Sequence, residues 1–172
     1  MSTKREGAVT FKGGPVTLVG SEVKVGAKAP DFKCLNVLSP VTLADTPAKA
    51  RLFSVVPSLD TPVCGTQTKK FEEQIRGLGD SVACYTVSLD LPFAQKRFCG
   101  ENAISMTTLS DVHNGSFGEN WGVRIEGLPL PLLARSVFVV DKTGTVTHAE
   151  YVSEVTSEPN YDAAVAALKA AV

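Results

Sequence analysis

The feature that most limits the fold of this chain is an apolar segment in its first half that contains only one small polar residue. The run Leu52-Phe53-Ser54-Val55-Val56 is followed directly by Pro57. A strand with one face in water alternates apolar and polar residues, whereas a continuous apolar run is typical of a strand buried on both faces. Proline cannot continue the pairing of a central strand. The segment therefore predicts a buried central strand that ends at the proline.

A helix is expected to begin shortly after this strand. Thr61 precedes Pro62, and a residue before proline is disfavoured in the α conformation. Threonine is common at the N-cap and proline at the first helical position. We therefore expect Thr61 at the N-cap, which puts Cys64 in the first turn. Apolar residues continue at helical spacing until Gly77 or Gly79, one of which is expected to end the helix.

The rest of the chain alternates between strand and helix patterns, which predicts an α/β layer fold. A β-hairpin is expected at the N-terminus and a second one around residues 141–144, so the sheet should be mixed. The stretch from Ala29 is expected to be irregular or extended, and Gly100 should follow the second helix. The remaining expected elements are strands at 82–87, 106–109, 136–140 and 145–152, and helices from Pro92, over 114–121 and after Pro159. Neither a repeat nor a linker is present, which favours a single domain over residues 1–172.

Composition and motifs exclude several classes of partner. There are 17 Lys and Arg against 18 Asp and Glu, so no basic excess is available for a nucleic acid. No apolar run is long enough for a membrane span, and the N-terminus lacks the apolar core of a secretory signal. We therefore expect a cytoplasmic protein with reduced thiols. Glycine-rich nucleotide loops are absent, and His113 and His148 are isolated, so neither a nucleotide cofactor nor a metal is expected. The pair Glu72-Glu73 is interpreted as a solvated helix face.

The cysteines are the residues whose chemistry the pattern leaves open. There are four, too few and too scattered for a disulfide scaffold: Cys34, Cys64, Cys84 and Cys99. In the first turn of a helix, unpaired N–H groups and the helix dipole favour a thiolate at Cys64, and a thiolate is a nucleophile. A free cysteine is also a common core residue, and position alone does not separate the two interpretations. No Cys-x-x-Cys motif exists, and nothing in the spacing shows that Cys64 and Cys99 meet.

Two sequence blocks resemble a known family. Residues 57–64, Pro-Ser-Leu-Asp-Thr-Pro-Val-Cys, resemble the Pro-x-x-x-Thr-x-x-Cys signature of peroxiredoxins. Residues 90–100 resemble the second block of one subfamily, the bacterial thiol peroxidases, which are atypical two-cysteine peroxiredoxins. Further similarity at the N-terminal hairpin, at residues 134–141 and at residues 156–159 extends the resemblance over nearly the whole chain. Both blocks at this separation form a very specific pattern.

The resemblance implies a thioredoxin-like (peroxiredoxin) fold, with a central mixed sheet flanked by helices and an N-terminal β-hairpin. It implies that Cys64 is the peroxidatic cysteine and Cys99 the resolving cysteine of the same chain. Thr61 would hydrogen-bond the thiolate and the peroxide. Arg135 would arrive from a distant strand to stabilise the same charges, and Pro57 would shield the thiolate.

The implied activity is a thiol-dependent reduction of hydrogen peroxide and organic hydroperoxides through a sulfenic acid and an intramolecular disulfide. The resemblance implies recycling by thioredoxin, a homodimer and no bound cofactor. Cys34 and Cys84 receive no role from it. The sequence leaves two alternatives: a thioredoxin-fold redox sensor or holdase with slow turnover, and a structural protein in which all four cysteines belong to the core.

Overall fold

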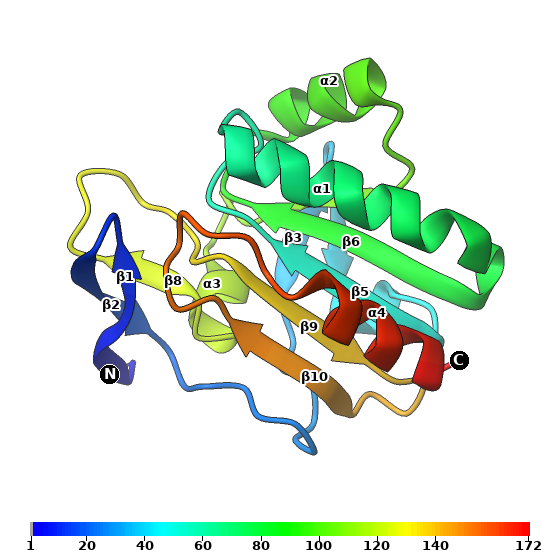
Figure 1. Cartoon of the computed structure of the whole chain (residues 1–172), viewed down its shortest axis with the longest axis horizontal. Coiled ribbons are helices and arrows are strands. Elements are labelled where there is room, and N and C mark those ends of the chain that lie inside the picture. The colour runs from blue at the N-terminus through cyan, green and yellow to red at the C-terminus, as the bar shows by residue number, and fades with distance from the viewer. Residues whose placement is uncertain (1) are drawn as a thin grey trace.

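The computed structural model describes residues 2–172 and is built around a seven-stranded mixed sheet (Figure 1). Its strands are β3 (Lys33–Asn36), β4 (Ser39–Thr42), β5 (Ala50–Val55), β6 (Val82–Ser88), β7 (Thr107–Ser110), β9 (Ser136–Val140) and β10 (Val146–Tyr151). They lie in the order β10-β9-β5-β6-β7-β3-β4. The three inner strands β5, β6 and β7 are parallel, and the outer pairs are antiparallel. The predicted mixed sheet is confirmed.

The predicted central strand is β5, and all six of its residues are buried. Its side chains alternate between the two faces, as a pleated strand requires. Leu52 contributes to the core on one face, whereas Phe53 lies in an aromatic cluster on the other face with Phe117 and Trp121. The strand ends at Val55, one residue before the predicted end.

Helices cover both faces of the sheet (Figure 1). They are α1 (Pro62–Ile75), α2 (Pro92–Asn102), α3 (Ser116–Asn120) and α4 (Tyr161–Ala170). Helices α1 and α4 pack on the face of the sheet to which Leu52 of β5 points. Helix α3 contributes Phe117 to the core on the opposite face. Helix α2 lies beside α1 and contacts β7. None of the helices in residues 2–172 is long and apolar enough to cross a membrane.

A second sheet of three strands holds the N-terminal hairpin. Strands β1 (Lys4–Phe11) and β2 (Gly14–Val19) form the predicted hairpin, and β8 (Arg124–Glu126) pairs with β2. The sequence did not predict β8, nor that the stretch expected to be irregular or extended forms the β3–β4 hairpin. These strands are three or four residues long, which is too short for a periodic pattern to appear.

Two helix ends differ from the prediction. Helix α1 stops at Ile75, and the 3₁₀ segment η2 (Arg76–Ser81) carries the chain on to β6; a second 3₁₀ turn is η1 (Leu43–Asp45). Helix α2 runs past Gly100 to Asn102. The left-handed residue that ends it is Ala103, with φ 53° and ψ 46°, and its N–H donates to the carbonyl of Cys99. The expected glycine cap was wrong because an alanine occupies that conformation.

Candidate functional site

Cys64 lies in the first turn of α1, the helix that follows the central strand β5 in the chain. Thr61 is the N-cap with extended backbone angles and Pro62 is the first helical residue, as predicted. The Cys64 side chain is completely buried, in a small apolar cluster with Val56, Leu59 and Phe98. A thiol that packs among apolar groups needs a polar partner if it is to carry a charge.

That partner is Arg135, in the segment before β9. Its side chain is buried, and its three nitrogen groups each donate to a different acceptor. Nη2 donates to Cys64 Sγ at 3.3 Å, Nη1 to Gln67 Oε1 at 2.8 Å and Nε to the carbonyl of Val155 at 2.8 Å. The structure therefore brings together two residues that are 71 positions apart in the sequence.

The charge of Arg135 has no carboxylate partner within ion-pair distance in the described part of the chain. The pKa of Glu158 is lowered chiefly by a hydrogen bond from Lys70, and that carboxylate pairs with the lysine. Apart from the sulfur of Cys64, the hydrogen-bond acceptors of the guanidinium are neutral oxygens. A buried cation with neutral ligands favours the anionic form of an adjacent acid, and Cys64 is the acidic group that Arg135 contacts.

Sequence reasoning missed the residue that orients the guanidinium. Gln67 lies one turn after Cys64 on the same face of α1 and is completely buried. Its Oε1 accepts from Arg135, and its Nε2 donates to Ser54 Oγ of β5 at 2.8 Å. Glutamine on a helix usually faces solvent, so no sequence signal identified it. The hydrogen bonds from Ser54 of β5 through Gln67 to Arg135 therefore hold the guanidinium in position relative to the central strand.

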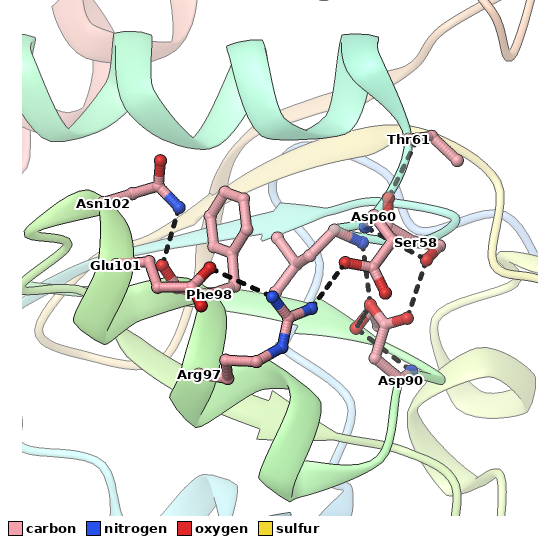
Figure 2. A network of polar contacts seen from close by, with 10 residues as sticks. Ser58, Asp60, Thr61, Asp90, Arg97, Phe98, Glu101 and Asn102 are labelled. Atoms are coloured by element: carbon pink, nitrogen blue, oxygen red, sulfur yellow. Dashed lines mark hydrogen bonds and ion pairs between the residues drawn. The ribbon is translucent and has the colours of Figure 1, made fainter.

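Thr61 and Pro57 stand on either side of the loop that leads into α1. The hydroxyl of Thr61 donates to the carbonyl of Ser58 at 2.9 Å, and its side chain does not cap the helix (Figure 2). Within residues 2–172 no hydrogen bond joins Thr61 to Cys64. Pro57 is buried two residues after the end of β5, in the segment that leads from the strand to the cysteine.

A polar network ties this loop to α2 (Figure 2). Asp90 accepts from Ser58 Oγ at 2.7 Å and from the Leu59 N–H at 2.8 Å. Arg97 of α2 pairs with Asp60 at 3.0 Å and with Glu101 at 3.0 Å. The exposed ion pairs stabilise little; the Asp90 bonds, which satisfy a backbone N–H, contribute more to the loop geometry.

Cys99 lies in the last turns of α2, half-buried against the apolar cluster that contains Cys64. Burial, and then the charge of Glu72, raise the pKa of Cys99 to about 11. Glu72 is itself buried, at 3% exposure, so its interpretation as part of a solvated face was wrong. It turns inward because backbone and hydroxyl donors of the segment after α2 converge on its carboxylate.

The other two cysteines lie away from this site. Cys34 is buried on β3, and its thiol donates to Asp111 at 3.7 Å. Cys84 lies on β6 and is partly buried. Burial raises the pKa of both thiols, that of Cys84 to about 12. All four cysteines are free in this structure, and residues 2–172 contain no cluster of three or more His, Cys, Asp or Glu that could hold a metal.

Comparison with known proteins decides the family. The Redoxin family model matches residues 24–165. A thiol peroxidase of Bacillus subtilis is 57% identical over 166 residues, which cover 95% of this chain and 98% of that protein. The chain belongs to the thiol peroxidase family. A thiol peroxidase of Streptococcus pneumoniae is 47% identical over 94% of this chain and 99% of its own length. Members of this family are peroxiredoxin enzymes, so the predicted enzyme class is confirmed.

Comparison with solved structures identifies the fold of this chain as well. A peroxiredoxin-like protein from Aquifex aeolicus superposes with a TM-score of 0.89 at 43% identity, and the match covers 99% of both chains. A thiol peroxidase from Chromobacterium violaceum has a TM-score of 0.84 at 16% identity, covering 94% of this chain and 95% of that one; this match supports the fold alone. The predicted peroxiredoxin-like thioredoxin fold with its N-terminal hairpin is confirmed.

Proposed function

We propose that this thiol peroxidase reduces hydrogen peroxide and organic hydroperoxides at Cys64. The observation that carries the proposal is the contact between the buried guanidinium of Arg135 and the Cys64 sulfur at 3.3 Å. A peroxide carries no charge, but its cleavage releases an oxyanion. A fixed cation that stabilises first the thiolate and then the departing oxygen lowers the barrier of the reaction.

In the first step the Cys64 thiolate attacks the terminal oxygen of the peroxide. The S–O bond forms as the O–O bond breaks, and the departing alkoxide or hydroxide takes a proton to give an alcohol or water. Cys64 is left as a sulfenic acid. Arg135, which contacts the sulfur, would stabilise this charge, and the helix dipole at the start of α1 would act in the same direction. Thr61 would rotate its hydroxyl toward the bound peroxide, and the buried Pro57 would keep water from the thiolate.

In the second step Cys99 attacks the Cys64 sulfenic acid. The S–S bond forms, the S–O bond breaks, and the hydroxyl leaves as water with the thiol proton. Disulfide geometry is strict, and both sulfurs start on folded helices. We expect α2 and the first turn of α1 to open locally for this step.

We further propose that thioredoxin reduces this disulfide and returns the enzyme to its dithiol state. The enzyme would act as a homodimer in the reducing cytoplasm. The four free cysteines suit such a compartment, since protein thiols there stay reduced. No cofactor is needed, because the electrons come from the two thiols themselves.

The test is a coupled assay with thioredoxin, thioredoxin reductase and NADPH, which also separates an enzyme from a slow redox sensor. Cys64→Ser should abolish peroxide-dependent NADPH loss with the fold intact, because serine does not ionise near neutral pH. Cys99→Ser should keep the first turnover but lose cycling, with Cys64 over-oxidising under excess peroxide. Cys84→Ser is the matched control and should cycle like the parent. Normal cycling of Cys99→Ser together with failure of Cys84→Ser would move the resolving role to Cys84.

A further inference from the structure

Helix α2, which carries Cys99, is held by a carboxylate at each end. Before the helix, Asp90 accepts hydrogen bonds from Ser58 and Leu59 in the loop that leads to Cys64. After the helix, Glu72 of α1 binds the chain at Ser105 and Met106. The eleven residues of α2 lie between these two anchors. A helix of this length is marginal in water without its tertiary contacts, so the two anchors contribute to how readily it opens, together with the buried side chains of Gln95 and Phe98.

The anchor at Glu72 has three donors. Its carboxylate accepts from the Ser105 N–H at 3.0 Å, from Ser105 Oγ at 2.7 Å and from the Met106 N–H at 3.3 Å. Arg76, the one cation that faces it within ion-pair distance in the described chain, is exposed and 3.9 Å away. The hydrogen bonds of the Glu72 carboxylate are therefore made with the segment after α2. Hydrogen bonds to a charged acceptor are stronger than those between neutral groups.

Between the helix and this anchor the backbone is strained. Ala103 has a left-handed conformation, which costs an alanine free energy that a glycine would not lose. The Cys99 carbonyl accepts from the Ala103 and Ile104 N–H groups at this turn. Opening the turn releases the strain and frees Cys99, whereas the bonds of Glu72 to Ser105 oppose the opening.

Resting on the proposed disulfide step, we infer that Glu72 is a positioning residue for that step. It holds the exit of α2 closed and so limits the rate at which Cys99 reaches oxidised Cys64. The segment that opens should accordingly end at Ile104, directly before the residue that Glu72 binds. The charge of Glu72 acts in the same direction, because it contributes to the raised pKa of Cys99 and disfavours the attacking thiolate.

The test compares Glu72→Gln with Glu73→Gln, a neighbouring exposed residue on α1 that gives the same charge change. Sulfenic Cys64 partitions between disulfide formation and over-oxidation, so intact mass at a fixed peroxide concentration reports the over-oxidised fraction per turnover. Glu72→Gln should lower that fraction by about tenfold, since roughly one charged hydrogen bond is lost. The rate of the first reaction with peroxide should stay within about twofold of the parent. Glu73→Gln should match the parent in both measurements.

Hydrogen exchange supplies a readout that does not depend on turnover. In reduced Glu72→Gln the amides of residues 98–104 should exchange faster than in the parent, with no change in Glu73→Gln. If Glu72→Gln does not fold, Ser105→Ala removes one donor and should lower the over-oxidised fraction by about threefold.

Equal over-oxidation in the parent and in the variant that folds, or slower disulfide formation in it, would overturn the role of Glu72. Failure of the proposed function looks different, since the parent itself would then form no Cys64–Cys99 bond.

Discussion

Replacing Arg135 by methionine tests the electrostatic part of the account. Methionine keeps an unbranched stem of similar length, so apolar packing is retained while the charge and all three hydrogen bonds are lost. The substitution leaves Gln67 Oε1 and the Val155 carbonyl without their buried donor. It also removes the one cation that contacts the Cys64 sulfur in the described chain. We expect less thiolate at neutral pH and a slower reaction with peroxide.

The size of the effect follows from the geometry. Two unit charges 3.3 Å apart attract by about 5 kcal/mol at an effective dielectric constant of about 20. Water that enters the vacated site recovers part of that energy, so the net value of a charged hydrogen bond, about 1.5–3 kcal/mol, is the better guide. At about 1.4 kcal/mol for each factor of ten, the reaction of Cys64 should slow by roughly 10- to 150-fold.

The assay is the rate of Cys64 alkylation by iodoacetamide from pH 6 to pH 10, with a peptide map to identify the thiol. The deficit of Arg135→Met should be largest near neutral pH and shrink in alkali, where both proteins carry a thiolate. Arg51→Met is the matched control, because Arg51 is also a buried arginine but its guanidinium binds the Thr46 hydroxyl and the Asp141 carbonyl. Equal alkylation rates in parent and Arg135→Met, or a deficit that is the same at every pH, would refute the electrostatic role.

Two other predictions concern the strained turn and the buried thiols. Ala103→Gly should relieve roughly 1 kcal/mol of left-handed strain, so disulfide formation should slow by about fivefold and over-oxidation should rise; faster disulfide formation by rapid-quench mass analysis would contradict this. Burial raises the pKa of Cys34, Cys84 and Cys99 in the folded protein above the ordinary value of 9.0, to about 12 for Cys84 and about 11 for Cys99. Above about pH 9 the thiols of the unfolded chain lose their protons, while the buried thiols of the folded protein still keep theirs. The free energy of unfolding should therefore be constant below about pH 9 and decrease as the pH rises beyond it. Urea unfolding at pH 8 and pH 10 measures this, and equal stability at both would be the contrary result.

Much of the architecture could be predicted because it depends on strong local signals. The apolar run before Pro57 and the Thr61-Pro62 pair fixed the strand, the helix start and the place of Cys64 in the first turn. The short strands β3, β4 and β8 could not be predicted in this way, although the four-residue β7 was expected. β8 has three residues, and its place in the N-terminal sheet depends on pairing with β2, which is distant in the sequence.

The burial of two polar residues on α1 was also not predicted, for a physical reason. Gln67 and Glu72 are ordinary solvent-facing residue types on a helix. Each is buried only because donors from a remote segment meet it: Arg135 in one case and Ser105 in the other. The left-handed conformation of Ala103 could not be predicted for a similar reason, because an alanine adopts it only where the surrounding structure stabilises it.

The measurement that tests the central claim most directly is a peptide map of the native protein after one equivalent of peroxide, without reductant. We predict one intramolecular disulfide between Cys64 and Cys99, with Cys34 and Cys84 still free thiols. The same sample should show loss of amide protection from Leu91 to Ile104 while β5 and β6 keep theirs. A disulfide that leaves out Cys64, or a chain in which all four thiols survive the peroxide, would contradict the account.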